Sequence, residues 1–364
     1  MDFDIKWEVL KELTETYAIS GFEEDITNML KKNINLPFSQ DDLGSCLFTK
    51  EGNGISIMIA THMDEVGFVV REIDEQGYLY FQNVGNMWSH VLLNQKVAII
   101  NEEKKIYYGV IGGPAVHSIK EKEREKVLPI DKLYIDMGVS SKKRIEELGI
   151  KVGDMICPYA EMIELNEEGY LAGKAFDNRV SVATGIWLMN MLKNENIGNK
   201  VTLAATVQEE VGLRGARTTA HKVFPDLAIA VDTTLAGDTP LNKNNIKLGK
   251  GVAINVIDSM TIMNRGLLIY MENLCRKNNI SYQLSCFTDG GTDAGNIHKS
   301  GTGIPATTLS IPMRYMHTHL GVVHKDDIIS ALKLLKLIIE DLTPEKYERI
   351  LKENYHYSEE NNKT

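Results

Sequence analysis

The stretch that decides the fold is Ile55-Ser56-Ile57-Met58-Ile59-Ala60-Thr61-His62-Met63-Asp64-Glu65-Val66-Gly67. An apolar, β-rich run ends in His62, and Asp64 follows two residues later. In open α/β sheets, ligands bind in the crevice outside the carboxyl ends of the strands. A single His-x-Asp is a weak indication of a metal, because a lone histidine is more often simply hydrogen-bonded. A metal site is therefore predicted only if other strands end in the same way.

The composition narrows the class of protein. A chain of 364 residues, 43% hydrophobic and 25% charged, is large enough for two or three globular domains. The net charge of −10 offers no basic surface for nucleic acid and no attraction to an anionic membrane. Four scattered cysteines favour a reducing compartment, and no signal peptide or apolar run of about 20 residues is visible. We expect a cytoplasmic protein that binds neither nucleic acid nor membrane.

The pattern of predicted helices and strands changes twice along the chain. Alternating helix and strand patterns fill residues 1–70 and 169–345, which predicts a discontinuous α/β main domain. Residues 71–168 carry short β-rich runs separated by turn residues, which predicts a small inserted β domain. Its mixed-charge run, residues 121–126, is interpreted as a solvated loop. Residues 346–364 are predicted to be a polar C-terminal tail, disordered from Ser358.

Other apolar strands also run into histidine or carboxylate side chains. The strand at 201–207 runs into Glu209 and Glu210, and the strand at 227–231 runs into Asp232. The strand at 306–311 leads, after a short segment, to His317. A further carboxylate, Asp177, stands just before a predicted helix.

Each of these residues has an ordinary interpretation when it is taken alone. Asp177 and Asp232 suit helix caps, and adjacent glutamates are usually surface charges. Together, however, two histidines and four carboxylates would gather at one edge of one sheet, where the acids repel one another unless cations neutralise them. The set is too rich in carboxylate for one tetrahedral zinc, so it predicts two divalent ions, zinc or cobalt, about 3.5–4 Å apart.

The adjacent glutamates suggest a division of labour. Neighbouring residues on a regular strand point to opposite faces, so the strand must already be ending if both side chains reach one site. One of Glu209 and Glu210 would then bind metal while the other moves protons. The sequence by itself leaves open which does which.

These motifs resemble the M42 family of dinuclear metallo-aminopeptidases, which includes glutamyl aminopeptidases, deblocking aminopeptidases and TET peptidases. The similarity falls in order along nearly the whole chain, in the segments Thr61–Phe68, Gly173–Arg179, Gln208–Ala216, Asp232–Pro240, Gly291–Ala294 and Pro312–His317. It implies a mixed-sheet α/β/α metallopeptidase catalytic domain, with the insert serving dimerisation. It also implies assembly into twelve-subunit homo-oligomers.

The resemblance further implies a role for each residue. His62 and Asp232 would bind one metal ion. Glu210 and His317 would bind the second, and Asp177 would bridge the two.

Two more roles follow from the same resemblance. Glu209 would be the general base and acid that activates a metal-bridging water, and Asp64 would orient His62, a partner that a metal-bound histidine needs. A cis peptide is implied between Asp177 and Asn178. The implied reaction is hydrolysis of N-terminal residues from peptide substrates.

The sequence also departs from the family pattern. Thr318-His319-Leu320-Gly321 stands where the family often has Ser-Pro-x-Glu, so an acidic group is missing at Gly321. His319 is interpreted as exposed or hydrogen-bonded rather than as an additional ligand. Residues 86–90 depart from the usual pattern at subunit contacts, and His117 is either a plain loop residue or one that reaches a neighbouring subunit.

Several alternatives stay open at this stage. Thr288–Ala294 either lines the substrate pocket or forms a structural turn. A glycosidase would need two acids flanking the bond and no metal, which adjacent glutamates beside two histidines fit poorly. A non-catalytic binding protein with the same fold is a further alternative. The preferred N-terminal residue, the metal in vivo and the assembly state are not determined by the sequence.

Overall fold

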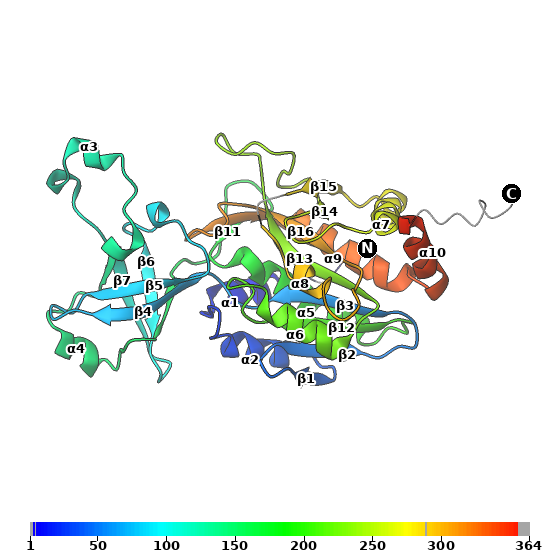
Figure 1. The fold of residues 1–364 in the computed structure, drawn as a ribbon, viewed down its shortest axis with the longest axis horizontal. Coiled ribbons are helices and arrows are strands. Elements are labelled where there is room, and N and C mark those ends of the chain that lie inside the picture. The colour runs from blue at the N-terminus through cyan, green and yellow to red at the C-terminus, as the bar shows by residue number, and fades with distance from the viewer. Residues whose placement is uncertain (1–2, 4, 288–289, 356–364) are drawn as a thin grey trace.

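The structure, a computed structural model, describes residues 3, 5–287 and 290–355. The chain forms a large sheet-and-helix body from which a smaller β domain projects (Figure 1). None of the described helices is long and apolar enough to cross a membrane.

The described strands of the large body form one mixed sheet of eleven strands. Its central strands β12, β3, β13 and β16 are parallel, so their carboxyl ends share one edge. The order across the sheet is β1 (Phe38–Gln40), β2 (Cys46–Lys50), β12 (Lys200–Thr206), β3 (Ser56–His62), β13 (Leu227–Leu235), β16 (Ala306–Arg314), β17 (Gly321–His324), β11 (Tyr170–Gly173) and β10 (Ile163–Glu164). Beside β16 lies a branch of two further strands, β14 (Val252–Ile257) and β15 (Tyr282–Cys286).

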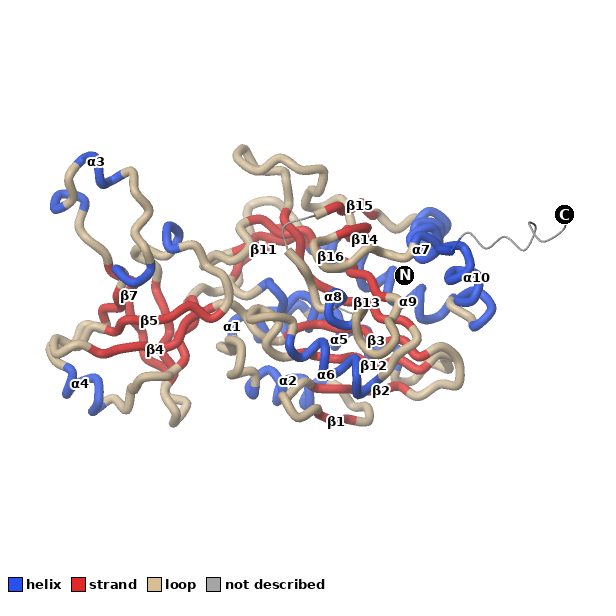
Figure 2. The backbone as a smooth tube through the Cα atoms, viewed as in Figure 1, coloured by secondary structure: helices blue, strands red, loops and turns tan. Residues whose placement is uncertain are grey.

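Helices cover both faces of this sheet, which confirms the predicted α/β/α layers (Figure 2). On one face pack α1 (Trp7–Glu15), α2 (Glu24–Asn33), α5 (Phe176–Leu192), α7 (Arg265–Asn278) and α9 (Lys325–Asp341). On the other face pack α6 (Arg214–Val223) and α8 (Ala294–Ile297).

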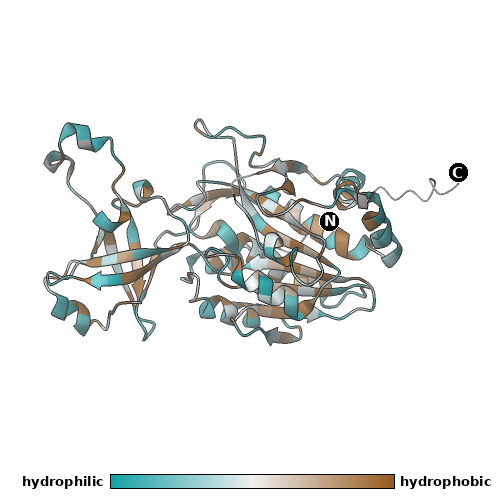
Figure 3. Ribbon diagram, in the orientation of Figure 1, coloured by the Kyte–Doolittle hydropathy of each residue, from teal (hydrophilic) through white to brown (hydrophobic). Residues whose placement is uncertain are grey.

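The two faces of the sheet differ because side chains alternate along each strand. In β3, Ile57 and Ile59 belong to the large core beneath α5 and α9, whereas Met58 and Ala60 face α6 and α8. Figure 3 shows hydrophobic (brown) colouring along strands of the central sheet. The same alternation continues to His62, so its side chain points toward the α6 and α8 face.

The inserted domain is a closed barrel with its own apolar core. Its strands run in the order β4 (Gly67–Ile73), β5 (Leu79–Val84), β8 (Tyr134–Asp136), β7 (Ile106–Gly112), β6 (Lys96–Ile100) and β9 (Met155–Pro158), and β9 closes the barrel against β4. Its helices are α3 (Glu121–Arg124) and α4 (Lys142–Glu147), and the first of these lies within the charge run predicted to be a loop. The first barrel strand begins at Gly67, four residues before the predicted boundary of 71, and the last one ends at Pro158, ten residues before 168.

The C-terminal region needs a correction. Residues 346–355, predicted to belong to a polar tail, lie in α10 (Pro344–Tyr355), which packs against α7. Ile350 is buried there, and its carbonyl oxygen would be 2.2 Å from a Cβ atom placed on Gly266. The absence of a side chain at Gly266 therefore lets the two helices meet. The segment predicted to be disordered, from Ser358, lies outside the described residues.

Candidate active site

The central sheet opens at the point where the predicted ligands begin. Pairing between β3 and β13 ends at Ala60 and Ala230, whereas β13 continues beside β16 as far as Leu235. Asp232 therefore lies inside β13 rather than after its end, which corrects the expected position. Because Asp232 and His62 come two residues after the last pair, both side chains project from the opened edge on the α6 and α8 face.

Asp177 lies between the two histidines. His62 Nε2 is 3.2 Å from Asp177 Oδ1 and 3.5 Å from Asp232 Oδ1. His317 Nε2 is 3.4 Å from Asp177 Oδ2 and 3.3 Å from Glu210 Oε2. Each oxygen of Asp177 thus faces a different histidine.

This geometry forms two groups of potential ligands that share one residue. His62, Asp177 and Asp232 form one group, and Asp177, Glu210 and His317 form another, with the candidate ligand atoms of each group within 4.8 Å of one another. A third group of His62, Glu209 and Glu210 meets the same distance. The structure therefore brings together all the residues that the sequence singled out for metal binding.

The donor set fits divalent cations. Imidazole nitrogens with several carboxylates suit borderline ions such as zinc and cobalt. Glu210 Oε1 is buried and has no hydrogen-bond partner among the described residues, which is a costly state for a carboxylate oxygen without a cation. The pattern of pKa shifts points the same way. Burial raises the pKa of Glu210 to about 8, with Asp177 adding to the effect, so without a cation this group tends to hold a proton.

Glu209 differs from the other acids of the cluster. Its Oε2 is 4.0 Å from His62 Nε2, farther than any of the contacts around Asp177. Burial raises the pKa of Glu209 well above its usual value, and the charge of Asp232 adds to this although His62 opposes it. A buried carboxyl with a raised pKa, set slightly back from the ligands, is suited to proton transfer.

Comparison with known proteins gives the family. Residues 44–334 match the family described as M42 glutamyl aminopeptidase. The chain belongs to the M42 peptidase family. It is 35% identical over 347 residues to the putative aminopeptidase FrvX of Escherichia coli K12, covering 93% of this chain and 96% of that one.

Two solved structures show that this M42 chain shares its fold with TET peptidases. The TET aminopeptidase from a marine sediment archaeon, Thaumarchaeota archaeon SCGC AB-539-E09, has a TM-score of 0.91 and 36% identity, covering 94% of this chain and 98% of that chain. The TET1 peptidase of Pyrococcus horikoshii, which can assemble into a tetrahedron or a large octahedral shell, has a TM-score of 0.83 and 31% identity, covering 92% and 99%.

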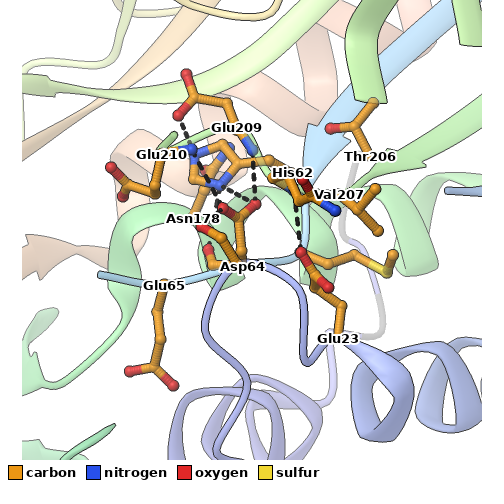
Figure 4. Close-up of polar contacts among 12 residues, drawn as sticks. Glu23, His62, Asp64, Glu65, Asn178, Thr206, Val207, Glu209 and Glu210 are labelled. Atoms are coloured by element: carbon orange, nitrogen blue, oxygen red, sulfur yellow. Dashed lines mark hydrogen bonds and ion pairs between the residues drawn. The ribbon is translucent and has the colours of Figure 1, made fainter. Parts of the chain in front are cut away.

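The carboxylate of Asp64 has more partners in this M42 chain than the sequence indicated. It accepts hydrogen bonds from Ser20 Oγ at 2.6 Å and from the backbone N–H groups of Glu209 and Glu210, both at 3.1 Å (Figure 4). His62 Nδ1 lies 3.1 Å from the backbone carbonyl oxygen of Asp64 and 3.5 Å from its carboxylate. Asp64 therefore holds the turn that carries the two glutamates, in addition to lying beside His62.

Ser20 and Glu23 lie just before α2, but neither side chain caps that helix. Ser20 instead bonds to Asp64, and Glu23 accepts a hydrogen bond from the backbone N–H of Gln208 at 3.0 Å. Glu23 thus supports the Gln208–Glu210 turn directly, and Ser20 supports it through Asp64.

A buried ion cluster, missed by the sequence reasoning, supports the loop after His62. Lys174 Nζ lies 2.7 Å from Glu65 Oε1, and Arg179 donates to the carbonyl of Met63 at 2.8 Å. Glu65 points away from His62 in Figure 4. All three charged side chains are almost fully buried, so they lock the Met63–Glu65 segment to the start of α5. Their positions inside matched motifs were the only signal in the sequence.

The peptide between Asp177 and Asn178 is cis, as the family resemblance implied. Asp177 does not cap α5, because its side chain faces the two histidines. The amide of Asn178 donates to the carbonyl of Val231 at 2.9 Å, which fixes this turn against β13.

The loop before α8 contributes to a cavity of about 400 Å³ at the cluster. Gly290, Gly291 and Thr292 line it, which supports the pocket interpretation of this loop for its described part. Asp293 is buried and accepts a hydrogen bond from Thr206 Oγ1 at 2.5 Å. Burial raises the pKa of Asp293 to about 7.

The departures from the family pattern have structural explanations. His319 is buried and bonds through Nε2 to the carbonyl of Lys96 in the barrel, so it links the His317 loop to the insert and is not one of the clustered ligands. The Met313 methyl group lies 2.1 Å from where a Cβ of Gly321 would be, so it occupies that space. His117 is exposed in a short turn of the barrel, and its contact with a neighbouring subunit stays a prediction.

Proposed function

We propose that this M42 chain is an aminopeptidase that depends on two divalent metal ions and removes N-terminal residues from peptides. The observation that carries the proposal is the pair of ligand groups that share Asp177, with Glu209 beside them. His62, Asp232 and Asp177 would hold one ion, and Glu210, His317 and Asp177 the other. Zinc and cobalt are the ions that this donor set favours.

The chain's own residues supply the remaining chemistry. Bound ions would lower the pKa of a water toward about 7 and polarise the scissile carbonyl. Glu209 would accept a proton from the attacking water at a carboxylate oxygen and then deliver it to the nitrogen of the leaving amine, which breaks the C–N bond. Asp64 would keep Glu209 at the correct distance through its hydrogen bond to the Glu209 N–H.

The decisive variant is Glu209→Gln, which keeps the shape of the side chain and removes its proton transfer. We expect a loss of about 10²–10⁴-fold in kcat with the metal content nearly unchanged. Glu168→Gln, an exposed acid outside the site, serves as the matched control. An active Glu209→Gln enzyme would refute the assignment of the base.

Metal dependence is tested separately. Chelator treatment should abolish hydrolysis of aminoacyl-4-nitroanilides, and readdition of zinc or cobalt should restore it. His62→Ala and His317→Ala should each lower the metal content of the purified protein by about one ion per chain, because each histidine belongs to a different ligand group. An enzyme that stays active after all metal has been removed would exclude this mechanism.

We further propose that the chain assembles into homo-oligomers, with the barrel contributing subunit contacts. Large aromatic side chains are exposed on the barrel, with Trp88 at 59% and Tyr108 at 56%. Exposed apolar groups of this size are typical of interaction surfaces when they cluster. Light scattering of the full chain should give a mass of several subunits, and Trp88→Glu should reduce it. A cytoplasmic location stays a prediction.

A further inference from the structure

The loop that carries His317 joins two strands of the main sheet. β16 ends at Arg314 and β17 begins at Gly321, and the two strands pair antiparallel. Residues 315–320 between them form the loop of this hairpin. From this loop His317 Nε2 reaches to 3.3 and 3.4 Å from carboxylate oxygens of two other proposed ligands. The position of the His317 ring therefore depends on how the loop is held.

The backbone of the loop has an unusual conformation. Tyr315 has a φ of 62° and His317 a φ of 55°. Both angles lie in the left-handed region, which residues with a side chain adopt only where the surrounding structure holds them. Thr318 Oγ1 lies 2.7 Å from the carbonyl oxygen of Tyr315 and 2.9 Å from that of Leu320, so its hydroxyl can donate to either. These contacts shape the loop but do not attach it to the rest of the molecule.

His319 is the one buried side chain of the loop, whose six residues are all described. It is 6% exposed, whereas Tyr315 is 54% and Leu320 38% exposed, and the other three are half-buried. Apart from the contacts of His317, the polar side-chain contacts from the loop to other parts of the chain all involve His319 Nε2. This atom lies beside the carbonyl oxygen of Lys96 and the N–H of Tyr159, both at the barrel. His319 is thus the polar anchor of the loop.

The atom that His319 contacts is rigidly held. Lys96 is the first residue of β6, which pairs with β7 on one side and β9 on the other. The N–H of Tyr159 lies 3.1 Å from the Lys96 carbonyl oxygen and 3.3 Å from His319 Nε2, so it donates to the carbonyl. Because a carbonyl oxygen can only accept, Nε2 carries the hydrogen of the ring and donates it to Lys96. Nδ1 is buried without a partner in the described chain, so one hydrogen bond makes the link.

We propose that His319 is a positioning residue for His317, because it ties the hairpin loop to the barrel and thereby fixes the His317 ring where the second metal ion binds. The inference rests on the ligand role proposed above for His317. It gives the barrel a part in the metal site, although none of the clustered ligands lies in the barrel. Without the bond, the contact left to hold the loop is the partial packing of Met316 against the large core. Metal binding would then have to order the loop, which lowers the affinity.

Two replacements of His319 separate the bond from the space that the ring fills. His319→Leu keeps an apolar side chain and removes the donor. His319→Gln places an amide N–H near the position of Nε2, so it should restore the bond to the Lys96 carbonyl. Lys96→Ala is a matched control, because it removes an exposed side chain and keeps the carbonyl. His221→Ala, an exposed histidine on α6, is the control for loss of an imidazole.

Metal binding is measured on the full chain by calorimetric titration of the metal-free protein with cobalt. We expect His319→Leu to lower the affinity for one of two ions by about tenfold or more, while the affinity for the other stays within about threefold. His319→Gln and both controls should stay within about threefold for both ions. His317→Ala identifies the affected ion. Turnover of His319→Leu should be low at limiting cobalt and recover when cobalt is raised.

A second measurement needs no metal. Chymotrypsin cleaves after exposed aromatic residues when the surrounding backbone opens, and Tyr315 is exposed in this loop. The metal-free His319→Leu protein should be cleaved after Tyr315 about tenfold faster than the unmodified chain, and His319→Gln within about threefold of it. Melting temperatures within a few degrees exclude global unfolding as the cause. His319→Asn, with an amide too short to reach the carbonyl, replaces His319→Leu if the latter does not fold.

The outcomes separate this inference from the proposed function. Unchanged cobalt affinities and an unchanged cleavage rate in His319→Leu overturn the inference. An equal loss of affinity for both ions, or a His319→Gln protein as impaired as His319→Leu, also overturns it, because the ring would then support the fold in general. If His317→Ala binds both ions as tightly as the unmodified chain, the proposed ligand role fails, and the cleavage rates still decide whether His319 holds the loop.

Discussion

Replacement of Asp64 by asparagine tests how the active-site turn is held. The Asp64 carboxylate is fully buried, and its two oxygens accept from Ser20 Oγ and from the N–H groups of Glu209 and Glu210. Asparagine has the same shape but can accept at only one of its two terminal atoms, so its NH₂ group must face a donor.

The magnitude follows from the bonds that change. One charge-assisted hydrogen bond is lost, about 1.5–3 kcal/mol, and one buried N–H is left unpaired, about 1–3 kcal/mol. We therefore expect Asp64→Asn to lower the free energy of unfolding by about 3–4 kcal/mol, allowing for relaxation of the turn. Since the turn positions Glu209, kcat should also fall, by about tenfold for each 1.4 kcal/mol lost from the transition state.

Urea unfolding followed by circular dichroism measures the first effect, and 4-nitroanilide hydrolysis with metal analysis measures the second. Ser20→Ala is the control, because it removes one charge-assisted bond to the same carboxylate without leaving a backbone N–H unpaired; a smaller loss of about 1.5–2 kcal/mol is expected. If Asp64→Asn unfolds at the same urea concentration as the unmodified chain and turns over within about twofold of it, the Asp64 carboxylate does not hold the turn.

Three further outcomes are expected. Lys174→Met should cost about 3–5 kcal/mol in urea unfolding, because it removes the nearest partner of buried Glu65; a smaller loss than for an average surface change would contradict this. Gly266→Ala should lower the melting temperature, because its Cβ would lie 2.2 Å from the carbonyl oxygen of Ile350. Burial raises the pKa of Asp327 from 3.8 to about 7, so between these values the folded protein keeps a proton that the unfolded chain has released. Its contribution therefore makes stability fall as pH rises from 4 to 7, and Asp327→Asn should remove that part of the slope in unfolding titrations.

Much of the fold follows from periodicity in the sequence. The apolar run that ends at His62 predicted β3, because the strand is buried and its pattern is local. The strands β14 and β15 were missed, since they are short and neighbour the sheet only through β16. Helix α10 was missed because its composition is mostly polar, and among its side chains whose burial is described only Ile350 is buried.

The ligand residues could also be predicted from the sequence, but the residues that hydrogen-bond to them and hold them in place could not. His62 and Asp232 follow apolar runs, so the common edge of the sheet brings them together. The partners of Asp64, by contrast, come from residue 20 and residues 209–210, and no local pattern relates positions so far apart.

The insertion of the barrel between two neighbouring strands affects how the chain folds. β3 and β12 pair in the centre of the sheet although about 140 residues separate His62 from Lys200. The two ends of the barrel already meet, since Phe68 pairs with Ile156. If the barrel forms first, it shortens the segment that remains to be closed to about 50 residues and lowers the loop-closure cost by about 1 kcal/mol. Formation of the inserted barrel is therefore expected to speed assembly of the sheet. The local strand pairing in the barrel would precede the slow, long-range pairing of β3 with β12.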